Sequence, residues 1–510
     1  MTRTSSTNIG TKASESSVVL DRLGSVLTND VRMVPDDLIL GHSRYQLPPA
    51  QYAHMSPEAW KNSSIPLEEQ GRYSQCTMYD PPDGPSNATR KVVECVQWDY
   101  DLSPGEETMV SQWNLVCGDA LDLPVIVAYI IVADMLSIPV IAQVSDKAGR
   151  RNVIYACVVF AAVTWGAVYF ATSYVLFTAG RIFLSIALST LRMNTLILLF
   201  EVTTPGYRDC FISAAHLGVA LAMTSAAMLD CATVSKRTVL TVGMIPTALF
   251  VLAVGVVDES PRLLATRWEF DRVNNVLRWM YRVNGTSFTP PPLKNHFHGQ
   301  AKRSVPRPSS AALRNRTILV GGVWFCLICS YYASWQLSPK ICDVTLLLVI
   351  SLYQVSTAPV SCVLLRLYGR KTSLSVVCVL SGGLACVQSV SVILPDYMAT
   401  ILRHLTLSTI LLNFFLCYVY TLELYPTVMR TMGVCTAMLC GKLGSIVSFF
   451  VRDQSKVHPS VPDILIAALM IGAMVLLSWL PETKYTKVPD TLYDVETQVV
   501  RGIVIKMFQK

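Results

Sequence analysis

Charged side chains recur at a constant offset in the two halves of this chain, within apolar stretches where charges are rare. The recurring positions, each pair 222 residues apart, are Arg181 and Arg403, Glu201 and Glu423, and Arg208 and Arg430. Carboxylates and guanidiniums that recur in register can form equivalent ion pairs in each half. Because long apolar runs separate these charges, the repeated unit is predicted to be a helical membrane bundle with charged clusters at one set of helix ends.

Two further motifs extend the repeat on either side of these charges. The Gly-Arg-Arg sequence at 149–151 returns as Gly-Arg-Lys at 369–371, an offset of 220, and Glu259 returns as Glu482, an offset of 223. Five registers at nearly one offset are not expected by chance. The duplication therefore predicts two halves with equivalent helix ends.

A second group of charges is predicted to lie deep within helices. A charged side chain near the middle of a bilayer costs about 2.5–3.5 kcal/mol, so such residues are usually functional or paired. Lys442 is expected about ten residues into its helix, and Arg192 near the middle of another. A fixed cation in a cavity attracts anions strongly. Alternatively, Lys442 pairs with Asp134 or Asp230, and Arg192 either binds the anion or pairs with Asp134.

The elements that position these charges are predicted from composition. The chain is 52% hydrophobic and 15% charged, with a mean hydropathy of +0.42, which is typical of a polytopic membrane protein. Spans of about 20 apolar residues can cross a bilayer as helices. We expect eleven of them, at about 123–143, 152–172, 175–200, 211–233, 238–257, 317–337, 343–365, 373–394, 399–421, 432–451 and 462–480.

The distribution of Lys and Arg predicts the orientation. The linker 258–316 holds eleven Lys and Arg against four Asp and Glu, and the turns after the predicted spans 123–143 and 343–365 are also basic, so this side should face the cytoplasm. Cytoplasmic loops are routinely basic, and no nucleic-acid partner is expected. The predicted parts are a segment 1–122, an N-terminal bundle 123–257, the linker 258–316, a C-terminal bundle 317–483 and a tail 484–510.

The segment 1–122 is acidic and aqueous in character. It contains nine Lys and Arg against seventeen Asp and Glu. Asn62 and Asn87 begin glycosylation sequences, which are meaningful only if the segment is extracellular. Its cysteines Cys76, Cys95 and Cys117 are three thiols in an oxidising space, so one should remain outside a pair, and the pairing stays open.

Short motifs in the turns resemble those of a known superfamily. Asp-Lys-Ala-Gly-Arg-Arg at 146–151 resembles the turn after the second helix of the major facilitator superfamily, and Arg-Lys at 370–371 resembles its repeat after the eighth. Glu-Ser-Pro-Arg at 259–262 and Pro-Glu-Thr at 481–483 are similar to the branch shared by sugar porters and organic-ion transporters. The fold class implied is an all-α membrane protein with two helical bundles and an internal repeat.

Three other stretches resemble the organic cation and anion transporters of that superfamily. They are residues 111–117, 324–332 and 421–427. The family pattern has twelve helices, a large glycosylated loop after the first, and cytoplasmic termini. Here residues 18–40 carry charges too often for a span of about 20 residues. We therefore expect eleven of the twelve helices, with either an outward N-terminus or a chain without the first helix.

The resemblance assigns roles to the charged clusters. We expect ion pairs that hold the inner helix ends together while the path is open to the outside, and that break when it opens inward. The alternative is that these charges only hold helices at the membrane interface. The candidate gating residues are Asp146, Arg150, Arg151, Glu201, Arg208, Arg370, Glu423 and Arg430.

A candidate substrate site follows from the same resemblance. At the position of Lys442 the family's cation transporters tend to carry Asp and its anion transporters Arg, so an anion is favoured. Family members use aromatic rings to stack on flat organic ions, although core packing explains single rings equally well. The candidate substrate-binding residues are Lys442, Tyr331, Tyr332, Trp324 and Arg192.

The motifs of common enzyme classes are absent from the sequence. It has no phosphate-binding loop, no His-Glu-x-x-His and no Gly-x-Ser-x-Gly, and its seven histidines are scattered. We therefore expect no enzyme, no cofactor and no metal. The expected function is transport of small amphipathic organic ions, with organic anions favoured, across the plasma membrane. Alternatives are an organic cation or sugar transporter, or a transport-inactive member acting as a binding partner.

Overall fold

The computed structural model is an all-α membrane bundle. It describes residues 65–66, 74, 76–80, 91–94, 112–113, 115–116, 122–231, 236–253, 255, 257–287, 311–338, 344–390, 394–484 and 486–490. Cys76 is disulfide-bonded, as expected for an oxidising environment. Asn62, Asn87, Cys95, Cys117 and the stretch 18–40 lie outside the described residues.

Five long helices are described in the first half of the bundle. They are α4 (Asp122–Ala148), α5 (Arg150–Tyr169), α6 (Tyr174–Val202), α7 (Pro205–Cys231) and α8 (Lys236–Ala253). Helix α6 begins with an ordinary helix cap, in which the Ser173 hydroxyl accepts a hydrogen bond from the backbone N–H of Leu176. Within this half, α6 packs against α4 and α5, and α5 packs against α8.

In the described part of the second half there are six long helices. They are α12 (Ala311–Leu337), α13 (Val344–Leu367), α14 (Arg370–Ser389), α15 (Asp396–Leu424), α16 (Arg430–Asp453) and α17 (Val461–Ser478), with the short 3-10 helices η6 (Thr427–Met429) and η7 (Gln454–Lys456) flanking α16. Helix α15 is buried along most of its length, because α12, α13 and α14 all pack against it. The main contacts between the halves are α4 with α16 and α7 with α13.

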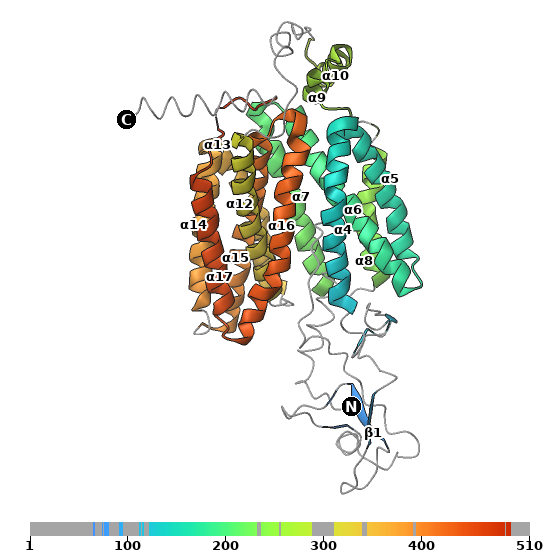
Figure 1. Cartoon of the computed structure of the whole chain (residues 1–510), viewed down its shortest axis with the longest axis vertical. Coiled ribbons are helices and arrows are strands. Elements are labelled where there is room, and N and C mark those ends of the chain that lie inside the picture. The colour runs from blue at the N-terminus through green and yellow to red at the C-terminus, as the bar shows by residue number, and fades with distance from the viewer. Residues whose placement is uncertain are drawn as a thin grey trace, which may run out of the picture.

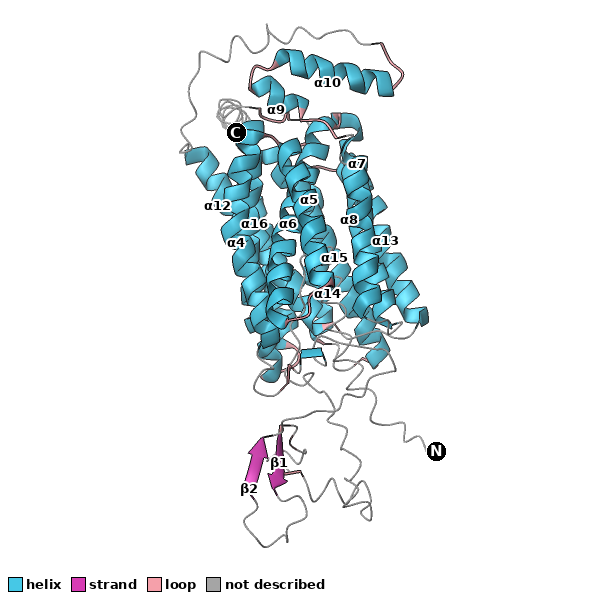
Figure 2. Ribbon diagram, turned by 90° about the vertical axis from the view of Figure 1, so that its right-hand side faces the viewer, coloured by secondary structure: helices cyan, strands magenta, loops and turns pink. Residues whose placement is uncertain are grey.

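The two halves lie side by side with their helices roughly parallel to one long axis (Figure 1). The helices α9 (Pro261–Thr266) and α10 (Phe270–Val283) lie beyond one end of the bundle, where α10 runs across the ends of the long helices (Figure 2). A hairpin of β1 (Thr77–Asp80) and β2 (Lys91–Glu94), paired antiparallel with Thr77 opposite Glu94, lies beyond the other end. We call the α9/α10 side the charged end.

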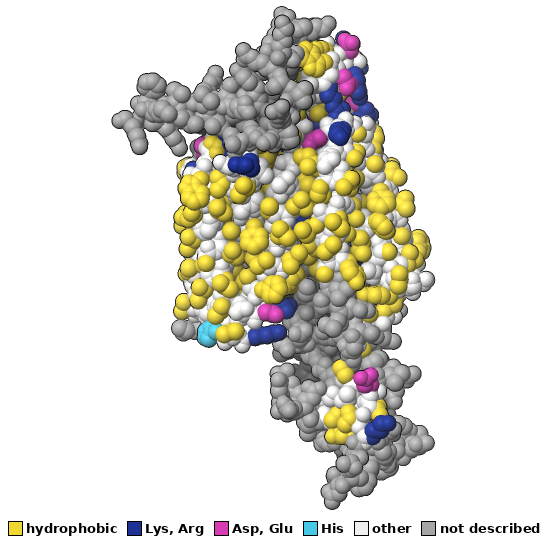
Figure 3. Space-filling model, viewed as in Figure 1, with side chains coloured by type: hydrophobic (Ala, Val, Ile, Leu, Met, Phe, Trp, Pro, Cys, Tyr) yellow, Lys and Arg dark blue, Asp and Glu magenta, His cyan; other side chains and the backbone are white. Residues whose placement is uncertain are grey.

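The outer surface agrees with a membrane environment. Hydrophobic side chains cover the flank of the bundle, and Lys, Arg, Asp and Glu gather mainly near its two ends (Figure 3). Many of these exposed side chains are large, including Leu136, Leu352 and Phe450. Exposed apolar area of this extent would be unfavourable in water but is the expected surface of a helix bundle in lipid.

Ten of the eleven expected spans are confirmed by length and composition among the described residues. The eleventh, expected at 238–257, corresponds to α8, whose described apolar stretch Leu240–Leu252 is shorter than the others. The count of eleven is therefore not confirmed.

The sequence repeat reappears as a repeated helix cap. In the first half the Glu259 carboxylate accepts hydrogen bonds from the backbone N–H groups of Arg150, at 3.1 Å, and Arg151, at 3.2 Å. In the second half the Glu482 carboxylate accepts them from Arg370, at 2.7 Å, and Lys371, at 3.1 Å. A carboxylate at a helix N-terminus satisfies unpaired N–H groups and complements the helix dipole. The two halves thus begin α5 and α14 in the same way.

Candidate functional site

The first cluster at the charged end joins the two halves. The Arg150 guanidinium lies 3.2 Å from Asp146 and 3.4 Å from Glu201, and it donates a hydrogen bond to the Thr427 carbonyl oxygen of the other half at 2.8 Å. Glu201 also pairs with Arg430 of the other half at 2.5 Å. Asp146 accepts a hydrogen bond from the backbone N–H of Met432. These contacts hold the charged ends of α4, α6 and α16 together.

The second cluster is built around Arg370. Its guanidinium lies 3.2 Å from Glu423 in its own half and 2.7 Å from Asp209 in the other half. Glu423 also accepts a hydrogen bond from the Thr483 hydroxyl at 2.6 Å. Because Asp209 belongs to α7 and Arg370 to α14, this ion pair is a second charged contact between the halves. A buried pair is costly to break, since removing one partner leaves an uncompensated charge.

Among the predicted gating residues, Arg208 and Arg151 have contacts of a different kind. The Arg208 guanidinium lies 4.1 Å from the centre of the Phe200 ring, and the Arg430 guanidinium lies 5.2 Å from the same ring, so both rest on an aromatic face. Arg151 contacts Tyr155 at 3.0 Å and Asp258 at 3.6 Å within its own half. These two contacts of Arg151 lie at the periphery of the first half and do not cross to the second.

Asp209 was not among the residues predicted from the sequence. It follows Arg208 directly and lies just after the first turn of α7, where an acidic residue is unremarkable near a helix N-terminus. Its partner Arg370 is 161 positions away. The signal in the sequence that could have identified it is an acidic residue directly beside a predicted cluster of arginines.

Tyr425, also at this end, is buried. Burial raises the pKa of its phenol to about 12 and keeps it a neutral donor to Thr317.

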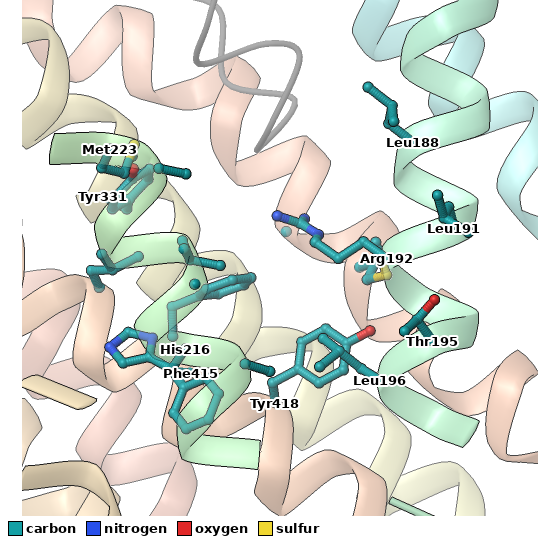
Figure 4. A pocket seen from close by; sticks show the side chains of 18 of the residues that line it. Leu188, Leu191, Arg192, Thr195, Leu196, His216, Met223, Tyr331, Phe415 and Tyr418 are labelled. Carbon is teal, nitrogen blue, oxygen red and sulfur yellow. The ribbon is translucent and has the colours of Figure 1, made fainter. Parts of the chain in front are cut away.

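A cavity of about 410 Å³ lies between the halves. This volume is within the range of small-molecule sites. Its walls come from α6, α7, α8, α12, α15 and α16, and they are mostly apolar and aromatic. Figure 4 shows Arg192 reaching from α6 toward the side chains on the opposite wall, among them His216 and Tyr331. All five predicted substrate-binding residues line this one cavity: Arg192, Trp324, Tyr331, Tyr332 and Lys442.

The predicted rings are held in place by neighbouring side chains. Trp324 is almost fully buried, and its indole N–H donates to the Thr421 hydroxyl at 2.9 Å. Tyr331 packs edge-on against Tyr332, with ring centres 5.5 Å apart. Further rings of the wall on α15, Phe414, Phe415 and Tyr418, were not predicted, because α15 reads as an evenly apolar helix. The cavity can therefore contact a flat apolar molecule from several sides.

Lys442 forms an ion pair across the cavity wall. Its Nζ lies 2.9 Å from Oδ2 of Asp134 on α4, and Asp134 is fully buried while the Lys442 side chain is 11% exposed. The hydroxyls of Ser185 and Ser189 donate to the same carboxylate. Of the alternatives left open by the sequence, the structure shows pairing of Lys442 with Asp134. Lys442 is thus a paired cation at the edge of the cavity, within reach of a ligand.

His216 is a further polar side chain of the cavity. Its Nε2 lies 2.9 Å from the Thr357 hydroxyl on α13, and its ring packs at a tilt against Phe415 with centres 4.4 Å apart. The histidines are scattered along the sequence, and none was assigned to the site. The signal in the sequence that could have identified it was a histidine inside an otherwise apolar helix, because a buried polar side chain usually has a hydrogen-bond partner.

The family follows from comparison with known proteins. Residues 84–490 match the protein-family model described as "Sugar (and other) transporter". The chain belongs to this family. It is therefore a multi-pass membrane transporter of the major facilitator superfamily, and not an enzyme, and it acts on a small-molecule substrate.

Individual relatives of this transporter fall in solute carrier family 22. The chain is 24% identical over 477 residues to solute carrier family 22 member 6 of Rattus norvegicus, covering 88% of this chain and 86% of that protein. It is 26% identical over 455 residues to member 13 of Homo sapiens, covering 85% and 81%. The human organic cation/carnitine transporter 2 is 25% identical over 426 residues, covering 78% and 73%. The relationship is distant.

Solved structures support the fold of this transporter. The proton:xylose symporter XylE from E. coli superposes with a TM-score of 0.60 at 15% identity, covering 76% of this chain and 92% of that one. The human organic anion transporter MFSD10 superposes with a TM-score of 0.50 at 15% identity, covering 69% and 82%. At this identity the similarity establishes the arrangement of helices alone.

Proposed function

We propose that this transporter moves small amphipathic organic ions, and organic anions in preference, across the membrane by alternating access. One observation carries the proposal. Among the described residues that line the cavity, the side chains with a full charge are the cations Arg192 and Lys442, and the rest of the wall is largely aromatic and aliphatic. A flat molecule with one carboxylate or sulfonate complements both features.

The comparisons support an organic ion but do not choose its sign. One relative is named for organic cations and carnitine, and one similar structure is named for organic anions. The charge of the cavity favours the anion, because an organic cation would face the guanidinium of Arg192 and the ammonium of Lys442, whose charge Asp134 offsets only from behind the cavity wall. A sugar is the second candidate, since the family model is described by sugar transport. The mostly apolar wall offers few partners for the hydroxyl groups of a sugar.

The ion pair of Lys442 with Asp134 suggests how an anion is received. In the absence of ligand the carboxylate of Asp134 satisfies the ammonium group. A substrate carboxylate entering the cavity competes for the same ammonium. The serine hydroxyls that donate to Asp134 keep its carboxylate partly satisfied when Lys442 turns toward the substrate.

The contacts at the charged end support a gate. We propose that this end faces the cytoplasm, because its turns are basic. The pairs Glu201 with Arg430 and Asp209 with Arg370, together with the Arg150 contact to the backbone of η6, join the two halves there. Opening of the cavity to the cytoplasm requires these contacts to separate. With this orientation, the conformation in which these contacts are formed is a state closed on the cytoplasmic side.

The acidic N-terminal segment belongs to the opposite side of the membrane in this proposal. Residues 1–122 face outward and are glycosylated at Asn62 and Asn87, and the chain acts at the plasma membrane. The disulfide at Cys76 supports an oxidising compartment for this segment.

Uptake by reconstituted protein tests the proposal. Separate samples of proteoliposomes are incubated with a labelled aromatic carboxylate, a labelled aromatic quaternary amine or labelled xylose in the external medium. We expect saturable uptake of the carboxylate, inhibited by unlabelled aromatic sulfonates. Uptake of the amine, undiminished by excess carboxylate, would contradict the assignment of the anion. Saturable uptake of xylose alone would favour the sugar.

A further inference from the structure

Two cysteines meet where the halves touch. Sγ of Cys210 on α7 and Sγ of Cys362 on α13 are 3.0 Å apart, although the residues are 152 positions apart in sequence. The sulfur atoms of a disulfide are about 2.0 Å apart, so a shift of about 1 Å would bring these two to bonding distance. Both side chains are partly exposed, and both are free thiols in this structure.

The pair belongs to a continuous row of contacts between α7 and α13. One turn further along α7, the hydroxyl of Ser361 donates to that of Ser213 at 2.9 Å. Another turn on, His216 meets Thr357. The partner numbers on α13 fall as those on α7 rise, so the helices run antiparallel and their side chains stay in register. The cysteines therefore face each other as part of the packing of the two helices.

The thiol pair lies at the charged end of this row. Asp209, the residue before Cys210, forms the ion pair with Arg370 that joins the halves at 2.7 Å. Cys362 lies five residues before the end of α13. Separation of α7 from α13 at this end would pull the two sulfur atoms apart, and a covalent bond between them would prevent it.

We propose that Cys210 and Cys362 are an oxidation site whose disulfide locks the two halves together at the charged end. This inference rests on the proposed gating function of that end. The oxidant is a hydroperoxide, for example hydrogen peroxide. Oxidation arrests the transporter in the state closed at the charged end, and reduction by a thiol releases it.

The chemistry balances with one peroxide for each disulfide. The sulfur of one cysteine attacks a peroxide oxygen, the O–O bond breaks, and a sulfenic acid and one water form. The second sulfur then attacks the sulfenic sulfur, the S–O bond breaks and the S–S bond forms, and the hydroxyl leaves as a second water. Both sulfur atoms are oxidised by one electron each, and the two thiol protons end in the two waters. A reducing thiol reverses the change by disulfide exchange.

A cleavage assay detects the bond without any transport measurement. The two cysteines are on opposite sides of the linker 258–316 in sequence, so a protease site inserted after Pro292 separates the halves of the chain when it is cut. We expect that after treatment of membranes with hydrogen peroxide the cut halves migrate together on a non-reducing gel, and separately once dithiothreitol is added. Mass spectrometry of the unmodified chain should identify the linked peptides of Cys210 and Cys362.

Variants identify the bond. Cys210→Ser and Cys362→Ser should each abolish the link, whereas the matched change Cys386→Ser, at an exposed thiol of α14, should leave it intact. Halves that separate after oxidation, or that stay linked in Cys210→Ser, would overturn the proposal. The mass spectrum of the unmodified chain decides the question if either serine variant fails to fold.

Transport then tests the lock itself. We expect peroxide to lower uptake at least tenfold in the unmodified protein and dithiothreitol to restore it, while Cys362→Ser stays active under peroxide. A link that forms without changing uptake would show that the halves need not separate there, and the lock would be wrong. If no substrate class is taken up, the proposed function fails, and the gel assay still reports whether the disulfide forms.

Discussion

The ion pair between Lys442 and Asp134 leads to a prediction about anion affinity that the family resemblance alone does not give. The two groups are 2.9 Å apart and almost completely removed from solvent. At an effective dielectric constant of about 20 their direct attraction is about 6 kcal/mol, much of which is offset by the cost of desolvating both groups. A substrate anion must compete with this carboxylate for the ammonium group.

Replacement of Asp134 by Asn removes the competitor. The amide has nearly the same shape, and its oxygen can still accept hydrogen bonds from Ser185 and Ser189. We expect Asp134→Asn to tighten binding of an aromatic carboxylate at least tenfold, which is about 1.4 kcal/mol. Lys442→Gln should weaken it at least tenfold. The double variant should also bind the anion weakly, because no charge then remains in the pair.

Equilibrium binding to purified protein in lipid nanodiscs measures these changes. A tritiated aromatic carboxylate is the ligand, and the neutral amide of the same acid is the control, whose affinity should change less than threefold in every variant. Weaker carboxylate binding in Asp134→Asn, to the extent seen in Lys442→Gln, would refute the reasoning. It would show that the pair is a structural unit and that Lys442 does not receive the anion.

Three other changes have expected outcomes. Glu423→Gln removes the carboxylate that fixes Arg370 and should lower turnover while leaving surface expression intact, since about 1–3 kcal/mol shifts a conformer population about 5–150-fold; misfolding would favour a purely structural role. Glu482→Gln weakens the cap of α14 and should lower the melting temperature by the equivalent of about 1 kcal/mol without changing anion affinity. N-glycosidase should raise gel mobility, and Asn62→Gln with Asn87→Gln should remove that change; indifference to the enzyme would place segment 1–122 in the cytosol.

Features that depend on local composition were predictable from the sequence. The long apolar helices were predictable, because a segment that crosses a lipid bilayer must be apolar and must satisfy its own backbone hydrogen bonds. Ten expected spans correspond to helices long enough to cross a membrane. The equivalence of Glu259 and Glu482 also followed from sequence, because a repeated turn motif reproduces the same helix cap in each half. All five predicted cavity residues line the same space for a related reason, since they lie on inward faces of long helices.

Features that depend on packing between the halves were not predictable. Asp209 and His216 acquire their roles from the approach of other helices, 161 and 141 positions away in sequence. The sequence left Asp134 and Asp230 as equal candidates for Lys442, because depth in a helix does not show which helix faces which.

The helices α4 and α16 connect the cavity to the charged end. Asp134 contacts Lys442 at the cavity, and twelve residues further along α4 Asp146 accepts a hydrogen bond from the backbone of Met432 at the charged end. Twelve residues of helix extend about 18 Å. The same pair of rigid elements therefore carries both contacts. An anion that takes Lys442 from Asp134 removes one of the interactions holding α4 to α16, and so favours states in which the two helices separate.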